Sequence, residues 1–199
     1  VVAALAVFFR AYGLASRNLW TDEAWVALAA LQATPGQALA AGQSTPPLYL
    51  LTVWAAARLW GGSELVLRSL SFAFGLGALA CSWLLARALL PLPASLLSLA
   101  LVSFSPIMVY YSKELKQYGA DAFFAVLVFL LVERVRASQG ERGWLPLIAA
   151  GILGLGFSHP LAFTLPVPAA GLWLMLPQHR LRVAATAAVW AFSFGLYYL

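Results

Sequence analysis

The chain has 199 residues, of which 63% are hydrophobic and only 10% are charged. Soluble globular proteins carry roughly 25% charged residues, so this composition excludes a water-soluble globule and predicts an integral membrane protein. The net charge of +5 comes from Lys and Arg residues scattered singly between apolar runs. This distribution argues against a nucleic-acid partner, which a basic patch would attract, and favours a role in membrane topology.

Seven apolar runs, separated by short polar segments, predict an all-α, polytopic membrane fold with about seven spans. The runs are residues 1–14, 69–89, 94–109, 120–135, 144–157, 161–176 and 181–199. We expect residues 1–199 to form a single transmembrane module. Because the chain begins without Met and ends inside an apolar run, we also expect it to be the N-terminal fragment of a longer protein.

Residues 46–60 leave two topologies open. The segment is apolar, but 15 helical residues cover only about 22 Å of a bilayer core that is about 30 Å thick. If it spans, every later loop changes sides. If it lies on the surface, which we favour, the later arginines fall opposite Asp22, and the positive-inside rule makes their side cytoplasmic. Asp22, Glu114 and His159 then share the extracytoplasmic face.

The adjacent acids Asp22 and Glu23 follow the first apolar run and lie between Trp20 and Trp25. Tryptophan is a common anchor at the membrane interface, but anchoring does not explain two of the chain's seven acidic residues. One interpretation is a helix that begins at Asp22, is capped by Thr21 and carries acids in its first turn. The other is a general base, with a carboxyl pKa raised by desolvation and by the acidic neighbour.

A second polar segment covers residues 110–121. On a helix, Glu114, Tyr118 and Asp121 would share one face, and Lys113 and Lys116 would share another. An ionisable residue at the start of an apolar run, such as Asp121, is a candidate functional residue. The alternative is a solvated loop whose lysines extend along the lipid.

His159 follows the run at 144–157 and precedes Pro160. A histidine in this position is more often a helix-end residue than a catalytic one, so by itself it is a weak candidate. No Cys/His cluster with metal-ligand spacing occurs, and Cys81 has no partner for an intrachain disulfide. The residues themselves therefore assign no metal site.

Together these segments resemble the polytopic GT-C glycosyltransferases, specifically the protein O-mannosyltransferase-like group (glycosyltransferase family 39). The matching runs are residues 19–24, 45–49 and 63–68, Ser105-Pro106 with residues 110–118, and Ser158-His159. They occur in the family's order across nearly the whole chain. The resemblance implies an inverting glycosyltransferase of the bacterial cytoplasmic (inner) membrane, with its active site on the outer face.

The resemblance also implies substrates and roles. The donor is a sugar on a polyprenyl phosphate, a divalent metal is possible, and no other cofactor is implied. Asp22 matches the catalytic base and Glu23 a second acid near the acceptor. Glu114 and Tyr118 match the second outer loop. The other substrate-binding candidates are Lys113, His159 and Lys116, the last of which replaces the more usual Arg and can neutralise a phosphate as a point charge.

Two departures leave the acceptor open. Protein O-mannosyltransferases carry a His before the double proline, where this chain has Thr45. The lipid A aminoarabinose transferases have a Lys near that point, which is also missing here. Family members are much longer, and their later spans help to enclose the lipid carrier.

The rival hypothesis is a transporter or flippase for a lipid-linked or small solute, with Asp121 and Glu114 as intramembrane charges. Transporters tend to have interrupted helices in paired repeats near the membrane midplane. In this sequence the charges cluster at one predicted face and no repeat is found, so we favour the enzyme. The two hypotheses differ in whether Asp22 and Glu114 line one outward-facing cavity.

Overall fold

The computed structural model describes all residues from 1 to 199 and is entirely helical, as the sequence predicts. The helices are α1 (Val2–Ala11), α2 (Thr21–Ala30), α3 (Pro35–Ala41), α4 (Pro47–Trp60), α5 (Glu64–Leu89), α6 (Leu92–Phe104), α7 (Pro106–Tyr111), α8 (Tyr118–Ala137), α9 (Trp144–Phe157), α10 (Leu161–Thr164), α11 (Pro166–Met175) and α12 (Arg180–Tyr198), with a short 3-10 helix over Pro177–His179.

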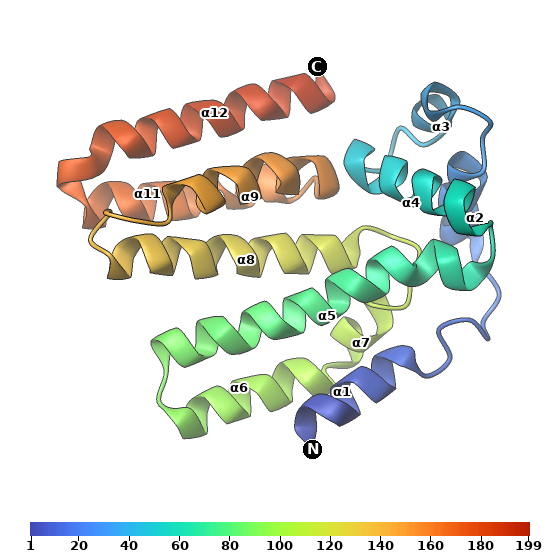
Figure 1. The fold of residues 1–199 in the computed structure, drawn as a ribbon, viewed down its shortest axis with the longest axis horizontal. Helices are drawn as coiled ribbons and strands as arrows, with labels where there is room; N and C mark the ends of the chain where they lie inside the picture. Colours follow the sequence, from blue (N-terminus) through green and yellow to red (C-terminus); the bar gives the residue numbers. More distant parts are fainter.

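The longer helices run back and forth along one axis of the molecule (Figure 1). One end carries α2, α3 and α4 together with the first residues of α5 and α8, and we call it the proximal end. The distal end carries the connections α5–α6, α8–α9 and α11–α12 (Figure 1). The segment between α1 and α5 therefore starts and ends at the proximal end of the bundle.

Residues 47–60 form a helix, and the double proline Pro46-Pro47 lies at its start. Pro47 occupies the first turn of α4, where the missing N–H costs no intrahelical hydrogen bond. The helix stops at Gly61, whose φ of 90° suits a residue without a side chain. Trp54 Nε1 donates to the Gln32 carbonyl at 3.0 Å, which fastens α4 to the end of α2. This helix lies at the proximal end and does not run to the distal end (Figure 1).

One helix, Glu64–Leu89, is by itself long and apolar enough to cross a membrane. The segments Leu161–Met175 and Pro177–Tyr198 satisfy the same criteria only as a pair, which is bent by 114°. The other predicted spans are helical but shorter or more charged. The arrangement with about seven spans therefore stays a prediction.

The predicted run at 94–109 is not continuous, because the helix breaks at Ser105 between α6 and α7. Pro106 has no N–H to donate and disfavours helical backbone angles in the residue before it. Ser105 accordingly has a ψ of 117°, and its hydroxyl accepts a hydrogen bond from the Met108 N–H at 3.4 Å to start α7. The break turns the chain toward the polar segment that follows.

Helices α5 and α8 pack closely at the proximal end because two glycines allow it. A Cβ on Gly119 would lie 3.0 Å from the Ser71 carbonyl oxygen. A Cβ on Gly75 would collide with the Ser112 side chain and lie 3.2 Å from its Cα. Small residues let helix backbones approach closely in membrane proteins. Here they bring residues 112–119 against the first half of α5.

Basic residues gather at the distal end. The loop after α8 is held to the α11–α12 connection by hydrogen bonds from Arg182 to the Gly140 carbonyl at 3.3 Å and between His179 and the Gln139 carbonyl at 3.0 Å. The arginines on these helices and loops are Arg87, Arg134, Arg136, Arg142, Arg180 and Arg182. They lie opposite the end that carries α2 (Figure 1).

Candidate active site at the proximal end

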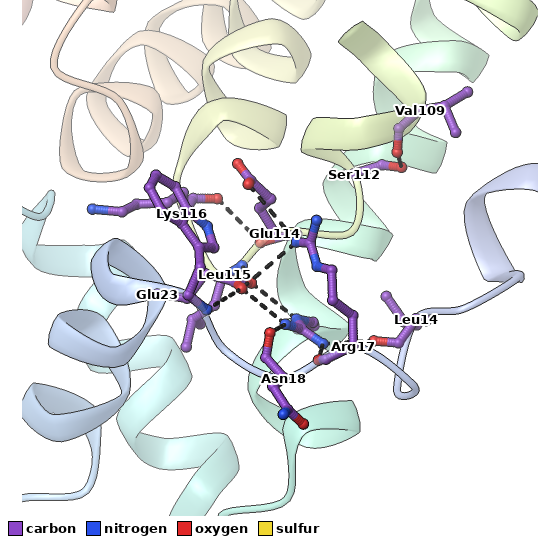
Figure 2. A network of polar contacts seen from close by, with 12 residues as sticks. Leu14, Arg17, Asn18, Glu23, Val109, Ser112, Glu114, Leu115 and Lys116 are labelled. Carbon is purple, nitrogen blue, oxygen red and sulfur yellow. Dashed lines mark hydrogen bonds and ion pairs between the residues drawn. The ribbon is translucent and has the colours of Figure 1, made fainter. Parts of the chain in front are cut away.

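A fully buried ion pair between Glu23 and Arg68 forms the centre of the proximal end. Arg68 donates from Nε to Glu23 Oε1 at 2.9 Å and from Nη2 to Glu23 Oε2 at 2.8 Å. The Leu115 N–H also donates to Oε1, at 2.8 Å. We call this arrangement the Glu23 clasp: one carboxylate joins α2, α5 and the segment before α8 through a paired, charge-assisted geometry (Figure 2).

Arg68 also fixes the loop between α1 and α2. Its Nη1 donates to the carbonyl oxygens of Leu14 at 3.1 Å and Arg17 at 2.7 Å, and Nη2 reaches that of Asn18 at 3.4 Å. Glu64, one turn earlier in α5, lies 3.4 Å away. The guanidinium is therefore satisfied in the way that a buried cation requires.

The protonation of Glu23 follows from these contacts. Burial favours the neutral acid and so acts to raise the pKa of Glu23, but hydrogen bonds from Arg68 and from the Leu115 N–H favour the carboxylate. Together with the charge of Arg68, they lower the pKa below its ordinary value. Glu23 is thus held as a carboxylate whose oxygens are already occupied.

Asp22, the predicted base, lies in the first turn of α2 and is only partly buried. It takes part in none of the chain's ion pairs. The prediction that Thr21 caps this helix is wrong: the helix begins at Thr21, Trp20 is the N-cap residue, and the Glu23 carboxylate accepts from the Trp20 N–H at 3.4 Å. Asp22 and Glu23 are therefore neighbours in sequence, but Glu23 is buried and ion-paired whereas Asp22 is partly exposed and unpaired.

Glu114 is completely buried, and neither of its carboxylate oxygens accepts a well-aligned hydrogen bond within the chain, although the Tyr110 hydroxyl lies close enough for Glu114 to raise the pKa of Tyr110. Its one close charge is Arg17, whose Nη2 lies 3.8 Å from Oε1. The same Nη2 lies 3.6 Å from Glu23 Oε2, so Arg17 stands between the two acids (Figure 2). A buried carboxylate without donors is well suited to accept hydrogen bonds from a ligand.

The segment that carries Glu114 is a turn rather than part of a helix, because α8 begins only at Tyr118. The predicted helical face shared by Glu114, Tyr118 and Asp121 is therefore wrong in its geometry. Burial raises the pKa of Tyr118, and the charges of Glu114, Asp22 and Asp121 raise it further, so these acids all act on one hydroxyl. Two acidic segments far apart in sequence thus influence the same phenol.

The ammonium groups of the two lysines in this turn lie in different surroundings. Lys113 Nζ donates to the carbonyl oxygens of Phe9 and Tyr12, both at 3.2 Å, at the end of α1. The Lys116 carbonyl accepts from the Ser71 hydroxyl at 3.1 Å, while its ammonium extends away from Arg17 (Figure 2). The two ammonium groups therefore do not share the face that the sequence predicted.

His159 lies at the same end of the bundle, in the turn between α9 and α10. Its ring is 5.1 Å from that of Tyr198, and burial lowers its pKa below the ordinary value. No hydrogen bond or ion pair joins His159 to the Glu23 clasp. Its role in substrate binding stays a prediction.

Sequence reasoning missed Arg17 and Arg68, which connect these acids. Arg68 was visible as the last residue of the 63–68 run, and an arginine inside a helix that is otherwise apolar needs a buried carboxylate partner. Nothing in the local sequence says that this partner is Glu23. No group of three His, Cys, Asp or Glu side chains lies close enough to hold a metal ion, and we assign no metal ligand here.

The fold and this site define a helical protein with at least one membrane-capable helix and a carboxylate-rich centre at one end of the bundle. Residues 44–198 match the family described as dolichyl-phosphate-mannose-protein mannosyltransferase. The chain belongs to this family, which confirms the resemblance to the GT-C glycosyltransferases. Among curated proteins and solved structures, none matches the chain.

Membership fixes the broad class. The family consists of membrane-bound glycosyltransferases of the GT-C type, and in general terms it uses a polyprenyl-phosphate sugar donor and an acceptor. An enzyme is thereby favoured over a transporter. The family match begins at Ser44 and therefore leaves out the segment that carries Asp22 and Glu23.

Proposed function

We propose that this chain forms the catalytic end of an integral-membrane glycosyltransferase, in which Asp22 is the general base. The enzyme transfers a sugar from a polyprenyl phosphate to an acceptor hydroxyl with inversion at the anomeric carbon. The observation that carries the proposal is the Glu23 clasp. It holds the start of α2, and therefore Asp22, against residues 114–118 while leaving Asp22 free of ion pairs.

The reaction is a single displacement. Asp22 accepts the proton of the acceptor hydroxyl as its oxygen attacks the anomeric carbon. The bond between that carbon and the phosphate oxygen breaks on the opposite face, and the polyprenyl phosphate leaves with the electron pair. Lys116 offsets the charge that develops on the leaving phosphate.

Glu23 does not contact the acceptor in this proposal. It contributes by holding Asp22 in position. Both of its oxygens are already hydrogen-bonded, to Arg68 and to the Leu115 N–H. Replacing the Glu23 carboxylate would remove the contact that joins α2 to α5. We therefore propose that Glu23 fixes where Asp22 stands when the acceptor binds.

Glu114, Tyr118 and His159 complete the proposed substrate site. The unpartnered oxygens of Glu114 can accept hydrogen bonds from sugar hydroxyls, and the partly exposed Tyr118 offers a hydroxyl beside them. We assign His159, in the turn after α9, to the same site as a further substrate-binding residue. A site of this kind recognises a polyol through several hydrogen-bonding groups at once.

The distribution of charge supports an orientation for the enzyme. The arginines at the distal end satisfy the positive-inside rule if that end faces the cytoplasm. The proximal end, with Asp22, then faces outward from a bacterial cytoplasmic membrane. The acceptor hydroxyl belongs to a protein, a lipid or a glycan.

A transfer assay tests the proposal with the full-length protein and a radiolabelled polyprenyl-phosphate sugar. Asp22→Asn should insert normally and lose transfer by about 100-fold or more, because an amide does not take the acceptor's proton. Glu133→Gln is the control, since Glu133 lies near the distal end of α8 and pairs only with Arg136. Full activity of Asp22→Asn would contradict the proposal, because Asp22 would then have only a structural role at the start of α2.

A further inference from the structure

A groove lies between α9 and α12, which pack side by side (Figure 1). Its volume is about 250 Å³. The lining residues are Trp144, Ile148, Arg182, Ala185, Thr186 and Val189. They come from successive turns of the two helices, so the groove extends along both. Trp144 and Arg182 lie in the first turns and place its mouth at the distal end of the bundle.

The mouth of this groove is held in place by the loop after α8. The Gly140 carbonyl accepts from Trp144 Nε1 at 2.8 Å and from Arg182 Nη1 at 3.3 Å. A Cβ on Gly140 would collide with the His179 ring, and the φ of 81° at this position favours glycine. The loop therefore packs tightly against the α11–α12 connection. The first turns of α9 and α12 are fixed to each other through one carbonyl group.

Arg182 keeps hydrogen-bonding capacity for a ligand. Its contact with Gly140 uses one of the N–H donors of the guanidinium and leaves the others free. It takes part in none of the chain's ion pairs. Among the lining residues it is the one with a charge, and the Thr186 hydroxyl already donates to the Arg182 carbonyl at 2.8 Å. An anion at the mouth would therefore bind Arg182.

The charge of the whole distal end favours such an anion. Its arginines, named above with the fold, outnumber its two acids, Glu133 and Glu141. Glu133 is already paired with Arg136, through contacts of 2.6 Å. The remaining arginines form no ion pair, so the end carries an excess of positive charge near the mouth of the groove.

Beyond Arg182 the groove is apolar. Ile148 on α9 and Ala185 and Val189 on α12 line it, and Ala185 and Val189 are exposed along the side of the bundle. Trp144 stands at the mouth, where an aromatic ring suits the level of lipid headgroups. Inorganic phosphate would use only Arg182, and a neutral lipid would use only the apolar part. A ligand that uses both has an anionic head and a hydrocarbon chain.

We propose that the groove between α9 and α12 binds an anionic glycerophospholipid, with the lipid phosphate on Arg182 and one acyl chain along Ile148, Ala185 and Val189. A guanidinium presents parallel N–H donors that match two phosphate oxygens. Basic pockets between membrane helices are typical sites for anionic headgroups. This lipid is a ligand of the distal end, opposite the end that carries Asp22, and takes no part in the transfer reaction.

The test measures lipid binding to the full-length protein in detergent by native mass spectrometry. The probes are dioleoylphosphatidylglycerol, dioleoylphosphatidylcholine, which has the same chains and no net charge, and inorganic phosphate. We expect the anionic lipid to bind about tenfold more tightly than the neutral one, and Arg182→Gln to remove this preference. Arg182→Lys should retain part of it, which separates the loss of charge from a folding defect.

A second variant tests the apolar part of the groove without changing any charge. Ala185→Phe adds a ring to an exposed position of α12 and so fills the space assigned to the acyl chain. It should weaken the binding of both dioleoyl lipids and leave the preference for the anionic head in place. If Ala185→Phe bound phosphatidylglycerol as the wild type does, the groove would not hold the chain and the proposal would be wrong.

Arg87→Gln is the matched control. Arg87 is an exposed arginine at the same end and lies 5.9 Å from the centre of the Trp83 ring, but it belongs to α5 and does not line the groove. Its replacement removes the same charge and should leave binding unchanged. Equal losses in Arg87→Gln and Arg182→Gln would show that net charge alone attracts the lipid, which would overturn the site. Equal binding of the two lipids, or inorganic phosphate binding as tightly as phosphatidylglycerol, would also overturn it.

This outcome is separate from the fate of the proposed function. Binding is measured without sugar transfer, and no residue of the groove belongs to the proposed catalytic site. Asp22→Asn should therefore bind phosphatidylglycerol as the wild type does, whether or not it transfers sugar. Arg182→Gln should lose the preference for the anionic lipid even if Asp22 proves to have only a structural role.

Discussion

Glu23 and Arg68 are 45 positions apart in the sequence and meet through two hydrogen bonds of 2.9 and 2.8 Å in the interior of the protein. Breaking a buried ion pair by removing one partner costs far more than the pair's net contribution, because the remaining charge stays buried. The sequence neighbour of Glu23, Asp22, is free of such contacts. Glu23 therefore holds α2, and Asp22 is left available for the role of general base that we propose for it.

The first prediction concerns this pair. Glu23→Gln should lower the free energy of unfolding by about 3 kcal/mol or more, because the buried Arg68 then has only the partly exposed Glu64, at 3.4 Å, to oppose its charge. The double variant Glu23→Leu/Arg68→Met should recover much of that loss and still show impaired transfer. Thermal unfolding in detergent, followed by the transfer assay, measures both quantities. If the single and double variants were equally stable, the ion pair would not be what holds α2.

The second prediction follows from the lowered pKa of Glu23. A carboxyl whose pKa is lower in the folded protein contributes stability above its unfolded pKa, near 4.3, and loses it as the pH falls through the folded pKa. The wild type should therefore lose stability on acidification below about pH 4 more steeply than Glu23→Gln does. Unfolding temperatures measured between pH 3 and pH 7 provide the comparison. If the unfolding temperatures of the two proteins fell in parallel as the pH was lowered, the lowered pKa of Glu23 would be contradicted.

The third prediction concerns the close approach of α5 to the turn before α8. Gly75→Ala should destabilise the protein by about 1–3 kcal/mol, since its Cβ would collide with Ser112 and force the turn to move. Gly171→Ala is the control, because a Cβ there meets nothing within 4 Å. This control should be neutral or slightly stabilising. Equal melting temperatures for the two variants would mean that α5 and the turn are not tightly packed.

The fourth prediction concerns the charge at the leaving phosphate. Lys116→Ala should reduce transfer strongly, whereas Lys116→Arg should keep much of it, because a positive charge is the property required. The measurement is the rate at saturating acceptor. Neither change should alter folding, since the contact of Lys116 with Ser71 uses its backbone carbonyl. An active Lys116→Ala variant would shift the role to another cation.

The sequence predicts much of the local structure because its signals are local. The apolar runs are helical, and the helix at residues 47–60 begins at its prolines, since proline acts within one turn. The interruption at Ser105 could also have been inferred from Pro106. The local pattern predicts Thr21 as the N-cap of α2, but the helix begins at Thr21 and the Glu23 carboxylate accepts a hydrogen bond from the N–H of Trp20, the N-cap residue.

The site was less predictable because its connections are tertiary. Composition and resemblance point to Asp22, Glu23 and Glu114, but the pairing of Glu23 with Arg68 depends on how α2 packs against α5. The divergence of Lys113 and Lys116 has the same origin: the turn between α7 and α8 has no helical repeat to set side-chain directions. Long-range packing decided each of these features.

Arg68 belongs to α5, the helix that is long enough to cross a membrane by itself. A helix of this length adapts to bilayers of different thickness by tilting. Because the Glu23 clasp joins α5 rigidly to α2 and to the turn at Leu115, such a tilt would carry Asp22 and Glu114 together through the headgroup region. If α5 spans the membrane as predicted, the lipid composition would thereby determine how deep Asp22 and Glu114 lie.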